Sequence, residues 1–188
     1  MGNNALLTAK YIGNRTLVKE LYSDVSGELI VITHQHSKVH EGKFFTSGHY
    51  VTGVLAGGTL DLLLLTPATK TMHTHIKLAA SADSTFAVYE DTVVSAVGTS
   101  VSIFNNNRSS VNVAEALCSH TPTITNVGTQ LDGLEYVPGG DTGNRVGTLQ
   151  DVGSEQLVLA SNKQYLLRLT NISVGTAILN IRLGFYEV

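Results

Sequence analysis

The residues best suited to chemistry lie close together in the run from His34 to Glu41, HQHSKVHE. If a strand covers the start of this run, His34 and His36 project from the same face, because successive side chains of a strand alternate between its two faces. Two imidazoles on one face can bind one transition-metal ion, and the carboxylate of Glu41 could supply a third ligand. The alternative is a set of exposed or hydrogen-bonded histidines at a strand end.

The spacing of these three residues resembles the first motif of the cupins, a family of metal-binding jelly-roll proteins. The resemblance implies that the three residues are ligands, and a fourth could come from His73 or His75 on another strand. Two parts of the cupin pattern are absent, because Glu28 occupies the position of the opening glycine and no second motif with Pro-x-Gly follows. A cupin-like metal protein or enzyme is therefore one alternative reading.

Other patterns that would indicate catalysis are missing. Cys118 is the only cysteine, so an intrachain disulfide is excluded and a buried, inert thiol is expected. The glycine-rich run 139–145 lacks the Lys-Ser/Thr of a phosphate-binding loop, and we interpret it as a turn. No Gly-x-Ser-x-Gly motif is present. We therefore expect a protein that is not an enzyme and has no cofactor.

Charge and hydropathy bear on the partners. Charged residues make up 14% of the chain, against about 25% in an average protein. A chain so poor in charge either buries part of its surface in an assembly or is a compact β protein with a Ser/Thr/Asn surface. The net charge of −3, without a cluster of Lys and Arg, predicts no nucleic-acid partner. The apolar run 62–65 is too short to span a membrane, so no membrane partner is expected.

The end of the chain gives the clearest structural pattern. Residues 178–186 alternate, with Leu179, Ile181, Leu183 and Phe185 on one face, as in a half-buried strand. Residues 165–170 have the same character. The run 171–175 between them is rich in turn formers, which predicts a hairpin.

The preceding segments add further strands. Alternating or continuous apolar patterns predict strands at 28–36, 44–54, 60–66, 72–78, 85–90, 101–104 and 156–160. In the strand at 72–78, His73 and His75 are expected to point outward. The pattern favours an all-β protein, a jelly-roll-like antiparallel β-sandwich over residues 27–188. Residues 1–26 are interpreted as an extended N-terminal arm. Residues 127–153 are interpreted as a long loop, which either projects as a functional loop or forms a contact surface in an oligomer.

A set of motifs resembles a widespread family of tailed-phage virion proteins. The motifs are His40-Glu41-Gly42 before Phe44-Phe45, Val88-Tyr89-Glu90-Asp91, Val101-Ser102-Ile103-Phe104-Asn105 with Asn107-Arg108, and the ending with Gln164-Tyr165 and Phe185-Tyr186-Glu187. Proteins of this kind resemble head decoration or cement proteins, which are β-sandwich modules that form trimers on the outer capsid and clamp neighbouring capsomers.

This resemblance implies a homotrimer that assembles in the host cytoplasm and binds the major capsid protein at the head surface. A structural domain of a tail fibre or baseplate is a further alternative. The arm would then reach a neighbour through its apolar residues, Leu6, Leu7, Tyr11, Ile12, Leu17, Leu21 and Tyr22.

Overall fold

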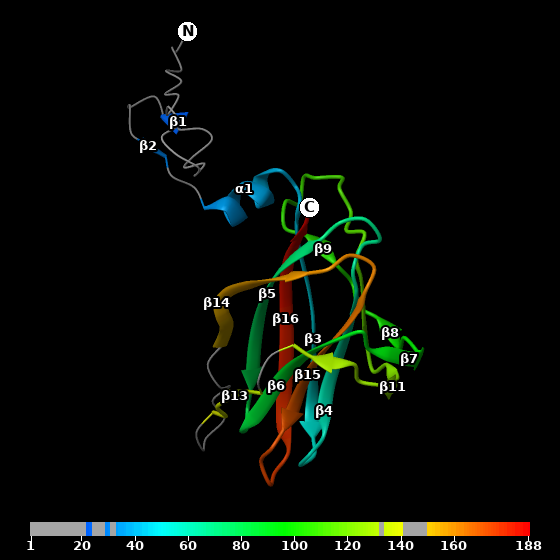
Figure 1. The fold of residues 1–188 in the computed structure, drawn as a ribbon. Helices are drawn as coiled ribbons and strands as arrows, with labels where there is room; N and C mark the ends of the chain where they lie inside the picture. Colours follow the sequence, from blue (N-terminus) through cyan, green and yellow to red (C-terminus); the bar gives the residue numbers. More distant parts are fainter. Residues whose placement is uncertain (1–21, 24–28, 31–32, 132–133, 141–149) are drawn as a thin grey trace, which may run out of the picture. The chain divides into compact units, whose positions relative to one another are not determined.

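The structure, a computed structural model, describes residues 22–23, 29–30, 33–131, 134–140 and 150–188 (Figure 1). The chain divides into two compact units, residues 1–37 and 38–188. In the first unit, strands β1 (Tyr22–Ser23) and β2 (Leu29–Ile30) pair antiparallel. The backbone of Tyr22 belongs to β1, and the other predicted arm contacts lie outside the described residues: Leu6, Leu7, Tyr11, Ile12, Leu17 and Leu21.

Helix α1 (His34–His40) replaces the second half of the strand predicted at 28–36, so this prediction is wrong. The Thr33 hydroxyl accepts the amide of His36 at 3.3 Å, as an N-cap residue does. At the other end, Gly42 has a φ of 66°, and the amides of Gly42 and Lys43 bond back to the carbonyls of Val39 and Lys38. This is a Schellman motif. Because no residue of α1 is buried, no core contact favours an extended conformation over this capped helix.

The second unit is an antiparallel β-sandwich, which confirms the predicted fold class. Its eight main strands are β3 (Phe44–Val54), β4 (Thr59–Leu65), β5 (Met72–Ala80), β6 (Ser84–Glu90), β13 (Glu135–Val137), β14 (Gln150–Leu159), β15 (Gln164–Asn171) and β16 (Ala177–Glu187). The first four pair with the last four in reverse order: β3 with β16, β4 with β15, β5 with β14 and β6 with β13. This pairing places the strands in two sheets as a jelly roll does. One sheet contains the strands β14-β5-β16-β3 in this order, and the other contains β6-β15-β4.

Residues 91–131, between β6 and β13, do not belong to this pairing of the first four strands with the last four. We call them the excursion. The excursion contains β7 (Val93–Ala96), β8 (Thr99–Ser100), β9 (Phe104–Asn105), β10 (Leu117–His120), β11 (Thr123–Asn126) and β12 (Thr129–Gln130). Strand β9 extends one sheet beside β3, and β10 with β8 extends the other beside β4. The segment that joins β8 to β9 therefore passes from the edge of one sheet to the edge of the other. No strand covers 101–103, so the strand predicted at 101–104 is mostly wrong.

The core lies between the two sheets and follows the predicted alternation. Leu179, Ile181, Leu183 and Phe185 of β16 are all fully buried. Each such side chain contributes about 1.5–3 kcal/mol through removal from water. Strands β4 and β15 supply the facing layer, with residues that include Leu60, Leu62, Leu64, Tyr165, Leu167 and Leu169.

The predicted hairpin at 171–175 is wrong, because β15 and β16 belong to different sheets. Asn171 is fully buried at the point where the chain crosses between them. Its side-chain amide donates to the carbonyls of Val54 (2.9 Å) and Gly175 (2.8 Å), and its oxygen accepts the Ser173 amide (3.0 Å). The turn formers therefore make an arch at the edge of the core, in which hydrogen bonds satisfy the buried amide of Asn171.

The segment 127–153 is not simply a loop, since it includes β12, β13 and the start of β14. Residues 132–133 and 141–149 of it lie outside the described part. Within the described residues, no helix is long and apolar enough to cross a lipid bilayer.

Candidate functional site

The structure does not support the strand geometry on which the alternative of a metal site at His34, His36 and Glu41 depends. His34 and His36 lie two residues apart on helix α1, where side chains at this spacing point roughly 200° apart. Glu41 instead pairs with the ammonium groups of Lys38 (2.9 Å) and Lys43 (3.3 Å). Among the residues that the structure describes, no three or more His, Cys, Asp or Glu side chains are grouped as metal ligands would be.

His73 and His75 point away from the core on β5, as predicted, while Met72, Thr74 and Ile76 are buried. The ring of His73 stacks on Tyr186 of β16, with centroids 4.6 Å apart. The ring of His75 lies 6.1 Å from that of Phe44. Both histidines therefore pack against aromatic rings of the same sheet, His73 against one on the adjacent strand β16 and His75 against one on β3, the strand beyond it.

A histidine pair that the sequence analysis missed links the two sheets. His49 of β3 and His120 of β10 stack with centroids 3.8 Å apart and an angle of 11° between the rings. Burial lowers the pKa of His49, and the charge of His120 lowers it further. No spacing rule could find a pair separated by so much chain, because only the folding of two sheets onto one another brings them together.

The Asn-rich run at 105–112 forms a closely bonded loop next to the end of helix α1. Asn105 donates to the carbonyls of Gly42 (2.8 Å) and Asn112 (3.0 Å) and accepts the Asn107 amide (2.9 Å). Asn112 also donates to Gly42, at 3.1 Å. We call residues 105–112 the asparagine loop. Its side chains replace the missing sheet hydrogen bonds, so the loop has a defined conformation although it contains little regular structure.

The asparagine loop presents Arg108 to solvent. Asn107 accepts the Ser109 amide (3.1 Å) and donates to the carbonyl of His40 (3.1 Å), which fixes the backbone on both sides of Arg108. The guanidinium carbon lies 6.0 Å from the centroid of the Phe104 ring, within the range of a cation–π contact. In the described parts of the chain, Arg108 has no carboxylate within ion-pair distance.

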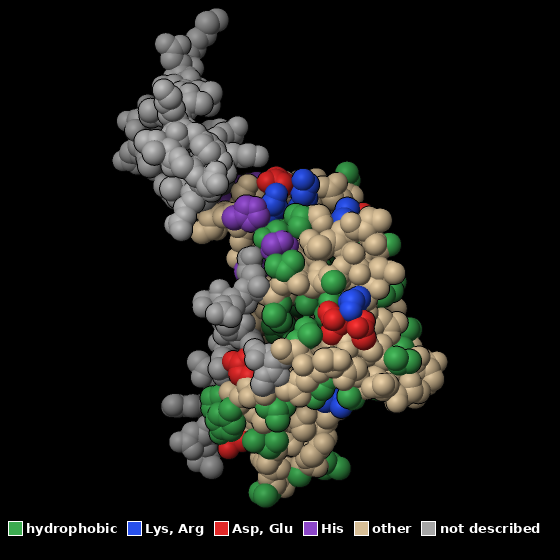
Figure 2. Space-filling model, in the orientation of Figure 1, with side chains coloured by type: hydrophobic (Ala, Val, Ile, Leu, Met, Phe, Trp, Pro, Cys, Tyr) green, Lys and Arg blue, Asp and Glu red, His purple; other side chains and the backbone are tan. Residues whose placement is uncertain are grey.

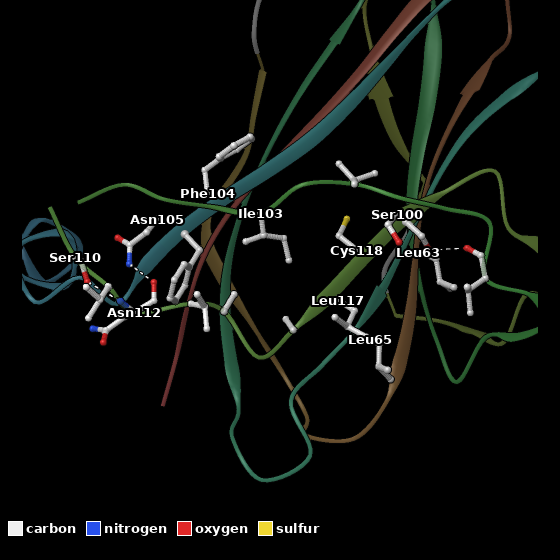
Figure 3. A pocket seen from close by; sticks show the side chains of 18 of the residues that line it. Leu63, Leu65, Ser100, Ile103, Phe104, Asn105, Ser110, Asn112, Leu117 and Cys118 are labelled. Atoms are coloured by element: carbon white, nitrogen blue, oxygen red, sulfur yellow. Dashed lines mark hydrogen bonds between the residues drawn. The ribbon is translucent and has the colours of Figure 1, made fainter. Parts of the chain in front are cut away.

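An apolar groove of about 510 Å³ runs from the asparagine loop to strands β4 and β10 (Figure 3). Its apolar end is formed by Leu63 and Leu65 of β4 and by Leu117, which lies opposite Leu65 in the sheet. Figure 3 shows Asn105, Ser110 and Asn112 at the other, polar end, with Ile103 and Phe104 between the two ends.

The rim of this groove leaves large apolar side chains in water. The exposed fractions are 94% for Val111, 83% for Val113, 63% for Leu117 and 55% for Phe104. Figure 2 shows that hydrophobic side chains also reach the surface in many places on one face of the molecule, while charged side chains form small groups there. The groove joins a guanidinium, an aromatic ring and apolar side chains, and these are the residue types enriched in protein interfaces.

Cys118 lines the inner wall of the groove and is buried, as predicted. Burial raises the pKa of its thiol to about 11. The thiol is therefore protonated at neutral pH and is a poor nucleophile.

Comparison with protein-family models, with curated proteins and with solved structures finds no significant match for this chain.

Proposed function

We propose that this protein is a decoration, or cement, protein of a tailed-phage virion. It would be a non-enzymatic homotrimer that binds the major capsid protein on the outside of the head and stabilises contacts between neighbouring capsomers. The observation that carries the proposal is the concentration of exposed apolar side chains on the excursion, which includes the hydrogen-bonded asparagine loop. The exposed residues are Val93, Val97, Phe104, Val111, Val113, Leu117 and Leu131.

Exposed apolar side chains grouped on one segment favour binding to another protein, because a soluble monomer gains nothing from keeping them in water. None of these exposed side chains belongs to the hydrophobic core, to which the excursion contributes Ala116 and Cys118. The excursion therefore has one side packed on the sandwich and apolar side chains left in water. Its function is best explained by contacts with other subunits.

A β-sandwich also suits a protein that reinforces a capsid shell. Paired strands in two packed sheets hold the excursion in a fixed shape, so little conformational entropy is lost when it binds. Each subunit contributes a modest binding free energy across a seam between capsomers. Since anything that binds only the assembled shell stabilises that shell, many copies together raise its resistance to rupture.

The experiment that tests this proposal uses particles of the phage that carries the gene. Heads that lack the protein are prepared by deleting the gene, and purified protein is added back. We expect saturable binding to the outside of the head, visible by electron microscopy, and a higher temperature of DNA release. A protein that is absent from purified particles would contradict the proposal. Its presence on the tail would support the alternative of a tail fibre or baseplate domain.

A further inference from the structure

We propose that the apolar groove together with Arg108 binds an extended segment of a partner protein, in which apolar side chains flank one acidic residue. This inference deepens the proposed function and rests on it for the identity of the partner, which would be a protein of the head shell. The chemistry of the segment follows from the groove itself.

The size and lining of the groove select a short, apolar segment. A volume of about 510 Å³ lies within the range of about 300–1,000 Å³ typical of ligand sites, and it accommodates a few side chains but no folded domain. The side chains of Leu65, Leu117 and Val113 offer apolar contacts along its length. A strongly polar segment would lose its hydration there without replacement.

The positive charge of Arg108 is the reason to expect an acidic residue in the bound segment. Most of the cations whose side chains are described already have carboxylate partners: Lys38, Lys43, Lys70, Lys163 and Arg168. Arg108 contributes to the lining of the groove and contacts only the Phe104 ring among the interactions of the described residues. A guanidinium binds a carboxylate with two parallel hydrogen bonds, and an adjoining apolar surface makes such a pair stronger than it is in water.

The asparagine loop holds the backbone around Arg108 in place before a partner binds. The backbone around Arg108 is held by the side chain of Asn107, and that of Asn105 ties the loop to Gly42. A partner therefore does not have to order the loop, which would otherwise lower its affinity. This explains why a loop with no buried core of its own contains so many amide side chains.

The test measures binding of two peptides to the full-length protein by fluorescence anisotropy. The probes are fluorescein-Gly-Gly-Val-Leu-Asp-Leu-Val-amide and the same peptide with Asn in place of Asp. Both are titrated with the wild type, with Arg108→Gln and with Arg182→Gln. Arg182 is a suitable control because it is an exposed arginine on β16 that does not line the groove.

We expect the wild type to bind the Asp peptide about fivefold more tightly than the Asn peptide, as for one carboxylate–guanidinium pair. Arg108→Gln should remove this difference, and Arg182→Gln should preserve it. Val113→Asp should weaken both peptides, while Val174→Asp, at a fully exposed site outside the groove lining, should not.

Two results would overturn the inference. One is an Asp-to-Asn difference that persists in Arg108→Gln. The other is a wild-type oligomer whose mass by light scattering falls in Val113→Asp while neither peptide binds, which would assign the groove to a second copy of this chain. Either result leaves the proposed function standing, since that depends on where the protein lies in the virion.

Discussion

The imidazole rings of His49 and His120 lie parallel, 3.8 Å apart, and connect β3 of one sheet to β10 of the other. They lie at the side of the sandwich where the excursion adds its strands. Two protonated rings at this distance would repel each other across the contact between the sheets. The pair therefore makes this edge of the sandwich sensitive to pH.

Stability should fall as the pH drops from 7.5 to 5. The folded state lowers the pKa of His49 below its ordinary value of 6.5, so below that pH the unfolded chain binds more protons than the folded one. Thermal unfolding followed by circular dichroism should show the midpoint decreasing over this range. The decrease should be smaller in His49→Gln and unchanged in His34→Gln, which alters an exposed helical residue. An equal decrease in all three proteins would contradict this prediction.

Replacing Asn105 should loosen the asparagine loop. Asn105→Ala removes two hydrogen bonds that the side chain donates and one that it accepts, and we expect the free energy of unfolding in urea to fall by about 1–2 kcal/mol. Backbone amide exchange should also become faster at 105–112. Ser102→Ala, at an exposed position of the preceding segment, serves as the control and should change neither quantity. Unaltered exchange in Asn105→Ala would show that the loop is held by other contacts.

Asn171→Ala should be more costly, because it removes a fully buried amide side chain together with its hydrogen bonds. The side chain donates to Val54 and Gly175 and accepts from Ser173, so we expect a loss of about 2–3 kcal/mol in the free energy of unfolding. Val174→Ala in the same arch is the matched control, since the side chain of Val174 is fully exposed. Similar unfolding curves for both variants would mean that Asn171 does not organise the crossing between the sheets.

Substitutions at the groove rim should weaken binding to heads and leave the stability of the fold unchanged. Val113→Asp places a charge on an exposed apolar position, so its unfolding midpoint should stay close to that of the wild type. Its binding to heads that lack the protein should fall at least tenfold in a sedimentation assay. Val174→Asp should bind as the wild type does. Normal binding by Val113→Asp would exclude the groove rim from the contact with the shell.

The thiol of Cys118 should resist alkylation while the protein is folded. Burial raises its pKa to about 11, so only a small fraction is thiolate at pH 8. Iodoacetamide should leave the native protein unmodified by mass spectrometry over minutes and should modify it fully in guanidinium chloride. Rapid, complete labelling of the native protein would indicate that the side of the sandwich around β10 opens readily.

Much of the fold could be predicted from the order of apolar and polar residues. The strand at 44–54 was predicted with the bounds that it has, and those at 60–66, 72–78 and 85–90 were close. Alternation succeeds in these strands because one face of each packs into the core between the sheets. It failed at 34–36, the start of helix α1, where no side chain is buried and the capping residues Thr33 and Gly42 decide the conformation. Those caps were visible in the sequence as a threonine before the run and a glycine after it.

The sequence by itself determined that the chain forms strands and which face of β16 is buried, because burial depends on local alternation. Only the tertiary structure decided which strands pair, for alternation carries no information about partners. It therefore separated β15 from β16 into two sheets and brought His49 onto His120. It likewise placed Arg108 at the end of an apolar groove, since the loop hydrogen bonds that hold it join residues about 70 positions apart, such as Asn107 and His40.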